Sequence, residues 1–406
     1  MQFKEVIGQV EVKQQLIDMY LQNRLGHALL FLGKEGSGAL SMARAFTQYI
    51  NCEKVNGKSA QGAGSLFGDA PQIEVGPHAD SCGICPSCVR SSGMINPDIH
   101  FSFPVITKKS GEKPVSTDYI SEWREFIKAN PYGNIYDWLQ FIKADNKQGN
   151  ITSAECNHII KTLSLKSFGA EFKFLIMWMP EFLGNEGNKL LKIIEEPPPN
   201  TIFIFVAEND QLILPTILSR TQLIKIPRIS TDDIKSALID DVQLKENEAL
   251  QIAILSEGNF REALQQVAHN EDNWEVQLRD WLNTILKTGP AEQVKWIEDI
   301  SKLGREKQKQ FLRYFNHLLE HAIRLRFMGD EAADKILIKN EKQDNNNDFA
   351  NRFNKLCNVN QQEAILKELD VAIYHIERNA NTKILFHALT IKIYHIISNK
   401  SVILVS

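Results

Sequence analysis

The sequence predicts an α/β domain built on a parallel sheet, followed by a region that is entirely helical. Three observations lead to this prediction. Short apolar runs alternate with helical segments over residues 1–228, as in parallel sheets. A glycine-rich loop joins the first run to a helix. After Pro227 the helix-start sequence Ser230-Thr231-Asp232-Asp233 opens a stretch of purely helical pattern.

Composition places the chain among ordinary globular proteins. It has 406 residues, 43% of them apolar and 24% charged, which indicates roughly two to four domains. Apolar runs stay below the ~18 residues of a membrane helix, and residues 1–5 lack the apolar core of a signal peptide. We therefore expect a cytoplasmic protein without a membrane partner. A net charge of −4 disfavours an extended DNA-binding surface but leaves a local basic patch open.

The first elements are expected in the order helix, strand, loop, helix. Residues 3–24 have an amphipathic pattern, and the apolar run 27–32 is bounded by glycine, as in a strand buried on both faces. The loop 33–38 follows, and residues 39–50 have helical composition.

Three further strands are expected at 172–179, 201–207 and 223–226. Between the first two of these, residues 185–196 read as a helix that is stopped by the prolines from Pro197 onward.

Two segments interrupt this pattern. Residues 54–80 are rich in Gly, Ser, Ala and Pro and are expected to be irregular. Residues 105–150 are polar and look like an insertion. Its aromatic residues form either a private core or a partner surface: Tyr119, Trp123, Tyr132, Tyr136 and Trp138.

Apolar residues at helical spacing predict buried helix faces in the last third of the chain, over 311–325, 364–376 and 384–397. The polar run 343–348 is expected to be a mobile loop.

The glycine loop has the frame of a phosphate-binding P-loop, G-x4-G-K-[ST], in a strand–loop–helix setting. The frame comprises Gly33, Gly36, Ser37, Gly38, Ala39 and Leu40. Ala39 stands where the phosphate-binding lysine belongs, and Leu40 stands where a hydroxyl would hold Mg²⁺. The alternative is a plain glycine turn without a ligand. Either interpretation predicts that this loop does not support ATP hydrolysis.

The second apolar strand indicates the same loss. A strand of this kind normally ends in acidic residues that hold Mg²⁺, but these positions fall on Met177 and Trp178. Glu181 follows too late in the chain to replace them. Two defects at one catalytic centre argue against an active ATPase.

Four cysteines suggest a metal site. Cys82, Cys85 and Cys88 form C-x2-C-x2-C, with Cys52 upstream. Four thiolates are the usual ligand set of structural Zn²⁺, with no open position for catalysis. His78 and His100 are spare candidates, and three loop thiols without metal remain the alternative.

Several segments resemble the AAA+ clamp-loader subunits of bacterial DNA polymerase III. The resemblance is dense over 1–52, 82–104 and 151–268. It includes the four-cysteine insertion. The other similar segments are 3–9, 24–31, 188–192 with 195–198, 214–220, and Arg378-Asn379-Ala380-Asn381. The degraded loop is similar to the delta-prime type of subunit rather than to the ATP-hydrolysing gamma/tau type.

The resemblance implies roles for further residues. Arg220, within Ser219-Arg220-Thr221, matches an arginine that this family inserts into a neighbour's ATP site, with Thr221 where the family has Cys. Arg261 matches the sensor-2 arginine, which contacts nucleotide in active members.

The resemblance also implies an architecture. It divides the chain into an AAA+-type P-loop domain (1–228) with a zinc module at about 52–90, a helical lid (229–275) and an all-α collar domain (276–406). The implied partners are gamma/tau and delta subunits, the sliding clamp and, through the complex, primed DNA. Structural Zn²⁺ is the implied cofactor, ATP is not hydrolysed by this chain, and the chain works as part of a DNA polymerase holoenzyme.

Two alternatives remain open at this point. One is an active ATPase motor subunit, which hydrolysis by the purified chain would support. The other is a zinc-dependent nucleic-acid-binding scaffold, which tight and salt-sensitive DNA binding would support.

Overall fold

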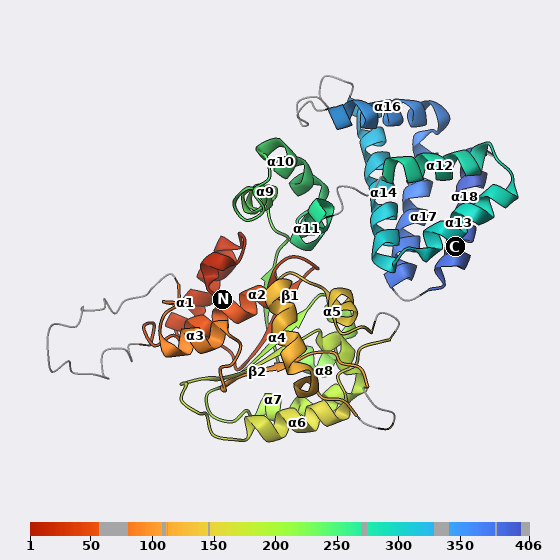
Figure 1. Cartoon of the computed structure of the whole chain (residues 1–406). Helices are drawn as coiled ribbons and strands as arrows, with labels where there is room; N and C mark the ends of the chain where they lie inside the picture. Colours follow the sequence, from red (N-terminus) through yellow and green to blue (C-terminus); the bar gives the residue numbers. More distant parts are fainter. Residues whose placement is uncertain are drawn as a thin grey trace. The chain divides into compact units, whose positions relative to one another are not determined.

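The computed structural model describes residues 1–56, 80–107, 111, 113–144, 147–268, 274–328, 341–377 and 380–398. It divides into two compact units, Met1–Val267 and Ala268–Ser406 (Figure 1). The segment expected to be irregular is 54–80, and its residues 57–79 lie outside the described residues. Arg378 and Asn379 lie outside them as well.

The first unit is built on a five-stranded sheet in which every neighbouring pair is parallel. The strand order is β2-β3-β4-β1-β5. Its strands are β1 (Ala28–Gly33), β2 (Ile99–Ser102), β3 (Lys173–Trp178), β4 (Thr201–Ala207) and β5 (Gln222–Ile226). This confirms the predicted parallel α/β sheet and adds the edge strand β2, which the sequence pattern did not reveal.

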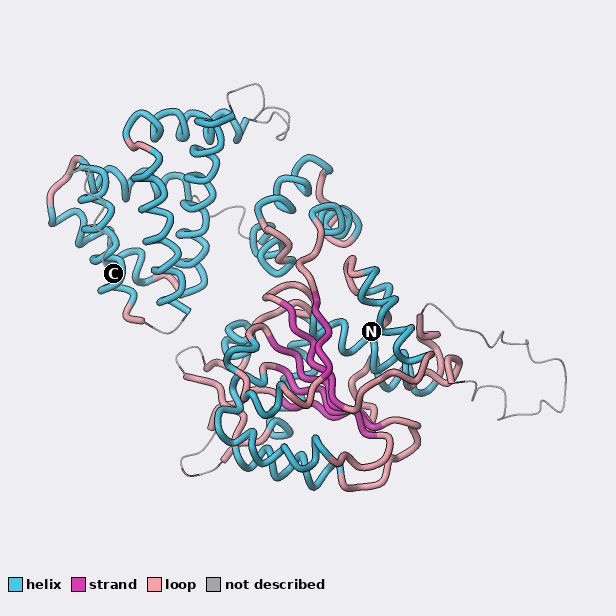
Figure 2. The backbone as a smooth tube through the Cα atoms, turned by 180° about the vertical axis from the view of Figure 1, so that it is seen from behind, coloured by secondary structure: helices cyan, strands magenta, loops and turns pink. Residues whose placement is uncertain are grey.

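Side chains of the strands alternate between two layers of core. Leu29 and Phe31 of β1 pack with one cluster, whereas Ala28 and Leu30 pack with the other. The first layer is covered by α1 (Val10–Leu21), α2 (Ala39–Ile50), α4 (Ile120–Ala129) and α5 (Ile135–Phe141). The second is covered by α6 (Ser153–Leu163), η4 (Pro180–Leu190), α7 (Leu191–Glu195) and α8 (Pro215–Leu218). Figure 2 shows the strands enclosed between helices.

Two predicted helices are shorter than expected. The segment 3–24 divides into a 3-10 turn, η1 (Phe3–Glu5), and α1. Gly8 and Gln9 between them have φ of 58° and 57°, a left-handed conformation that an α-helix does not contain. Of the predicted helix 185–196, only α7 is α-helical, because its first half belongs to the 3-10 element η4.

Three aromatic residues of the inserted segment, Tyr119, Trp123 and Trp138, belong to the main core. The segment forms η3 (Ser116–Tyr119), α4 and α5. Trp123 stacks on Phe103 with ring centroids 4.1 Å apart, and Trp138 meets the edge of Phe103 at 5.2 Å. Both tryptophans are fully buried in the cluster that covers the sheet. At these positions the segment is therefore neither a private core nor a partner surface.

Three helices complete the first unit: α9 (Thr231–Asp240), α10 (Glu246–Leu255) and α11 (Phe260–Ala268). The side chain of Ser230 accepts a hydrogen bond from the Asp233 backbone N–H at 3.1 Å, so the predicted helix start is confirmed. These helices share a separate apolar cluster that includes Ile234, Leu238 and Phe260.

The second unit is helical in its described residues. Its elements are α12 (Trp274–Leu286), α13 (Pro290–Lys302), α14 (Arg305–Met328), α16 (Glu341–Leu356), α17 (Val359–Glu377) and α18 (Thr382–Ser398). At its centre Trp281 stacks on Trp296 at 5.0 Å. The predicted stripe from Phe311 to Leu325 is buried. Within the described chain, every helix is too short or too polar to span a bilayer.

The predicted loop 343–348 is wrong, because these residues lie inside α16. Asn and Asp have low helix propensity. The same helix carries Phe353, which is buried in the core and contacts Phe315. Tertiary packing of its second half therefore stabilises a helix that local propensity disfavours.

Candidate functional site

The glycine loop lies between β1 and α2, at the carboxyl end of the sheet, where α/β proteins bind ligands. Gly36 and Gly38 have φ of 70° and 85°, so the loop needs glycine at both positions. Gly38 is the N-cap of α2. The predicted order of strand, glycine loop and helix is therefore present in the structure.

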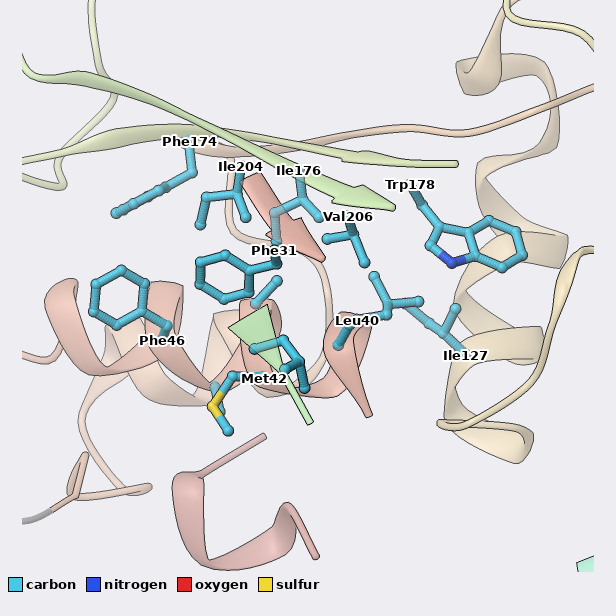
Figure 3. Packing of buried hydrophobic residues seen from close by; sticks show 14 of the residues in the cluster. Phe31, Leu40, Met42, Phe46, Ile127, Phe174, Ile176, Trp178, Ile204 and Val206 are labelled. Atoms are coloured by element: carbon cyan, nitrogen blue, oxygen red, sulfur yellow. The ribbon is translucent and has the colours of Figure 1, made fainter. Parts of the chain in front are cut away.

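The side chains around this loop are those of a hydrophobic core. Ala39 and Leu40, at the lysine and hydroxyl positions of the motif, are both buried. Met177 and Trp178, at the acidic positions of β3, are buried as well. Figure 3 shows Trp178 directed toward Leu40 and Ile127. These groups offer neither a cation for phosphate nor a ligand for Mg²⁺.

Glu181 supports the backbone rather than facing the loop. Its Oε1 accepts hydrogen bonds from the N–H groups of Glu208 and Asn209 at 2.7 and 2.9 Å. Burial raises the pKa of Glu181, while these backbone bonds act in the opposite direction. The carboxylate therefore fixes the turn that follows β4.

Arg261 lies against the glycine loop. Its NH1 donates to Glu35 Oε1 at 3.0 Å, and its Nε and NH2 donate to the two carboxylate oxygens of Asp137 at 2.5 and 2.6 Å. Only 4% of Arg261 is exposed. The arginine expected to face a nucleotide is thus bound by two carboxylates of the same chain.

Arg220 lies in the turn between α8 and β5. Its Nε donates to Glu195 Oε1 at 2.5 Å, and its NH1 donates to the Thr216 carbonyl at 2.7 Å and to Ser219 Oγ at 3.1 Å. The Thr221 hydroxyl donates to the Leu218 carbonyl at 2.9 Å and closes the same turn. The side chain of Arg220 is 34% exposed, so its position is defined while it remains accessible.

The sheet separates Arg220 from the glycine loop. β1 and β5 run in parallel, with Leu29 opposite Gln222 and Gly33 opposite Ile226. Gln222, two residues after Arg220, is thus level with the beginning of β1, while the loop follows its end. Four residues of strand span ~13 Å, so Arg220 does not reach the chain's own loop.

The four predicted metal ligands come together at the far end of α2. The sulfur atoms of Cys52, Cys82, Cys85 and Cys88 all lie within 4.8 Å of one another. Those of Cys82 and Cys88 are 3.9 Å apart. Tetrahedral bonds of ~2.3 Å from zinc place sulfurs about 3.8 Å apart, so this set fits a four-coordinate metal ion. His100 lies on β2, outside this group, and His78 is outside the described residues.

The thiols of this cluster are hydrogen-bonded to one another, and the pKa values of Cys52 and Cys88 shift in opposite directions. Hydrogen bonds from the thiols of Cys85 and Cys88 lower the pKa of Cys52 to about 3. Hydrogen bonds to Cys52 and Cys85, together with burial, raise the pKa of Cys88 because they stabilise its protonated form. Backbone N–H groups of Cys82, Cys85 and Cys88 also point at cluster sulfurs at 3.3 to 3.4 Å. A bound cation would balance the charge that these contacts stabilise.

Neighbouring polar contacts hold the cluster in place. Asp80 accepts hydrogen bonds from the N–H groups of Phe3 and Lys4, both at 2.9 Å. Glu53 accepts from Ser87 N–H at 3.2 Å, at the start of α3 (Pro86–Ser92). The cluster therefore joins the N-terminal segment, α2 and α3.

Sequence reasoning missed two residues of the glycine-loop region, Tyr132 and Asp137. A local signal existed for Asp137, because Asn134 and Asp137 form the capping box that starts α5. Asp137 also accepts a hydrogen bond from Arg261, which lies 124 residues later in the chain. No local sequence pattern indicates this contact.

The fold defines the class, an α/β protein with a parallel sheet and a glycine loop after its first strand. The family described as "DNA polymerase III, delta subunit" matches residues 8–230. The chain belongs to this family of clamp-loader subunits, and the resemblance seen in its sequence is confirmed.

Curated relatives carry names from the same assembly. The chain is 24% identical over 328 residues to the DNA polymerase III subunit tau of Bacillus subtilis, covering 78% of this chain and 46% of that protein. The delta' subunit of the same organism is 24% identical over 232 residues, covering 57% and 51%. The gamma/tau subunit of Mycobacterium tuberculosis is 27% identical over 219 residues, covering 54% and 27%. The chain thus spans about half the length of these relatives or less.

Two solved structures are similar at low identity. A gamma subunit-related protein of DNA polymerase III from Thermotoga maritima aligns with a TM-score of 0.39 at 14% identity, covering 96% of this chain and 99% of that one. The DNA clamp loader delta protein of Bacillus subtilis aligns with a TM-score of 0.29 at 10% identity, covering 94% and 99%.

Proposed function

We propose that this chain is a non-hydrolysing, delta-prime-like subunit of a DNA polymerase III clamp loader. The observation that carries the proposal is the chemistry of the glycine loop. The backbone has the course of a P-loop, but Ala39, Leu40, Met177 and Trp178 are buried where cationic, hydroxyl and acidic groups would be needed. A subunit of this kind contributes to ATP-dependent loading without turning over ATP itself.

Arg220 is the residue that we propose as its contribution to a neighbour's ATP site. The guanidinium is a fixed and permanently charged fork that suits phosphate better than lysine does. Bonds to Glu195, Thr216 and Ser219 orient Arg220, and its distance from the chain's own loop favours action on another subunit. Ser219 and Thr221 support the turn.

The domain roles follow the same proposal. Residues 1–228 would be the AAA+-type domain with the metal module and the insertion, 229–275 the lid and 276–406 the collar that joins subunits. Gamma/tau and delta subunits, the sliding clamp and primed DNA would be its partners. We propose Zn²⁺ as the ion of the four-cysteine cluster, with a structural role, because four thiolates leave no open coordination position.

The decisive experiment reconstitutes the loader with cognate gamma/tau and delta subunits and measures ATPase stimulated by clamp and primed DNA. Arg220→Ala is compared with wild type and with the control variant Arg228→Ala. Arg228 is another ion-paired arginine of the same unit, and its side chain is 57% exposed. An arginine supplied by a neighbouring subunit raises the rate of ATP hydrolysis ~10³-fold or more at the site it serves. We expect ATPase and clamp loading to fall partly with Arg220→Ala, since other sites remain, and to stay unchanged with Arg228→Ala.

Three outcomes would contradict the proposal. An assembled Arg220→Ala loader with wild-type ATPase would remove the role of Arg220. ATP hydrolysis by the purified chain alone would favour an active motor subunit. Failure to assemble, combined with tight and salt-sensitive DNA binding, would favour the nucleic-acid scaffold.

A further inference from the structure

The segment 113–144 reaches the glycine loop from outside the P-loop framework. It connects β2 to α6 and carries α4 and α5. It touches the beginning of α2, where Ser41 Oγ donates to the Pro131 carbonyl at 2.8 Å. It also touches the lid helices, whose apolar cluster includes Tyr132. One inserted segment thus contacts both sides of the place where nucleotide lies in a working P-loop protein.

Asp137 provides the polar half of this contact. Its two oxygens accept from Nε and NH2 of Arg261 at 2.5 and 2.6 Å. This two-point geometry is the one by which arginine also binds phosphate. Glu35 of the glycine loop takes the remaining NH1 at 3.0 Å. Arg261 is therefore held between the loop and the segment by carboxylates of the chain itself.

Tyr132 provides the apolar half. Its ring covers Gly38, where an added Cβ would lie 2.8 Å from Tyr132 Cε1. On its other side the ring meets Phe260 of α11 at 5.0 Å with an interplanar angle of 68°. Its hydroxyl accepts a hydrogen bond from the Ile7 N–H at 2.9 Å. A single side chain thus joins the start of α2 to the lid.

The lid also meets the loop directly. The Phe260 N–H donates to the Gly36 carbonyl at 3.2 Å, and Asn259 Nδ2 donates to Glu35 Oε1 at 3.2 Å. A Cβ on Gly36 would overlap the Asn259 side chain. The lid is therefore closed on the loop at this point.

We infer that the segment 113–144 is a built-in ligand that replaces nucleotide in this chain. The Asp137 carboxylate takes the part of a phosphate for Arg261, and the Tyr132 ring fills the space over Gly38. Together they hold the lid closed on the glycine loop in the absence of ATP. This inference is independent of the proposed role of Arg220, because it concerns only contacts within the first unit.

Hydrogen exchange of the full-length chain, followed by mass spectrometry, tests this inference. Asp137→Asn keeps the size of the side chain and removes its charge. We expect exchange in α11 and in residues 33–38 to rise about tenfold or more, as fits the loss of a charged hydrogen-bonded contact. Strands β1 and β4 and helices α12 to α18 should keep wild-type exchange. Millimolar Mg-ATP should leave exchange of the wild-type lid unchanged.

Glu257→Gln is the matched control, because it neutralises a carboxylate of the same unit that pairs with an exposed arginine, Arg228. It should leave exchange of α11 at the wild-type rate. Arg261→Gln combined with Asp137→Asn should raise exchange no more than Arg261→Gln alone, since Arg261→Gln already removes the contact with Asp137.

Two results would overturn the inference. The first is unchanged exchange in α11 and the loop with Asp137→Asn. The second is Mg-ATP protecting the wild-type lid, because the site would then still accept nucleotide. If Asp137→Asn loosens the whole first unit, Tyr132→Leu decides, since it removes the ring that contacts Gly38 and Phe260. A local rise in exchange with that variant supports the inference, and its absence overturns it.

Discussion

Individual side chains around the glycine loop were predictable where a motif fixes their position. The P-loop frame assigns Ala39 and Leu40 their places, and the structure buries both. Tyr132 and Asp137 were not predictable, because their partners Phe260 and Arg261 lie more than a hundred residues away. The spacing of a sequence motif shows which functional side chains are absent from it. It does not show which distant residues pack against the motif instead.

Restoring the motif should not restore activity. In the double variant Ala39→Lys with Leu40→Thr, an ammonium and a hydroxyl group would replace two buried apolar side chains, and Figure 3 shows Leu40 near Ile127 and Trp178. Burying polar groups without partners costs roughly 1–3 kcal/mol, and an unpaired charge costs more. We expect the free energy of unfolding in urea to fall by at least about 1 kcal/mol.

A fluorescent ATP analogue should bind this double variant no better than it binds wild type. Substituting the exposed Lys34→Ala in the same loop serves as a control that should leave stability nearly unchanged. Hydrolysis of ATP by the double variant would contradict the prediction.

His317 of α14 should make stability depend on pH. Burial, together with the nearby charges of His321 and Arg324, lowers the pKa of His317 to about 4. Between pH 6.5 and 4 the unfolded chain binds a proton that the folded chain does not, so stability falls as the pH is lowered. For one proton, the free energy of unfolding changes by at most ~1.4 kcal/mol per pH unit.

Urea unfolding of wild type and His317→Gln at pH 7.5 and pH 4.5 would measure this contribution. The loss of stability between the two pH values should be smaller in the variant. An equal loss in both proteins would assign the pH dependence to other groups.

At the scale of elements, strong periodicity was predictive and weak periodicity was not. The apolar strands β1, β3 and β4 were expected, and β2 was missed because its four residues are mostly only half-buried at the sheet edge. The α16 helix was missed because packing of Phe353 decides its structure rather than the composition of its polar half. Elements whose stability comes from distant contacts leave little local pattern.

Metal removal should loosen the elements that the cysteine cluster joins. The cluster connects the end of α2 to α3 and, through Asp80, to the N-terminal segment. We expect one zinc per chain by atomic emission, and loss of that metal in Cys85→Ser. Proton release on rebinding should accompany the restored structure, because thiols must ionise to bind the metal.

Strong chelation should lower the midpoint of thermal unfolding of the wild-type first unit. Cys156→Ala provides the control, since Cys156 lies on α6, outside the cluster. A metal-free wild type with unchanged hydrogen exchange in α3 would contradict the structural role.

The whole molecule should unfold in two steps, because each unit has its own apolar core. Trp138→Ala removes a fully buried ring of the first unit and its hydrogen bond to the Pro104 carbonyl at 2.7 Å. Such a substitution lowers the free energy of unfolding by about 3–5 kcal/mol. We expect it to shift only one transition in calorimetry, while Trp281→Ala shifts only the other.

Phe168→Ala is the control for these substitutions, because the ring of Phe168 is 83% exposed. It should change stability by less than about 0.5 kcal/mol. A single transition that both tryptophan substitutions shift equally would show that the two units unfold as one.

The parallel sheet gives the first unit a polarity. The glycine loop follows the carboxyl ends of the strands, and Arg220 precedes the amino end of β5. A contact that joins the loop side of one subunit to the arginine side of the next uses two different surfaces, so it is a head-to-tail contact and not a two-fold one. Under the proposed function, a chain with an arginine at one end and a non-hydrolysing loop at the other would serve only one neighbour. Such a subunit would then stand at the end of a row of shared ATP sites.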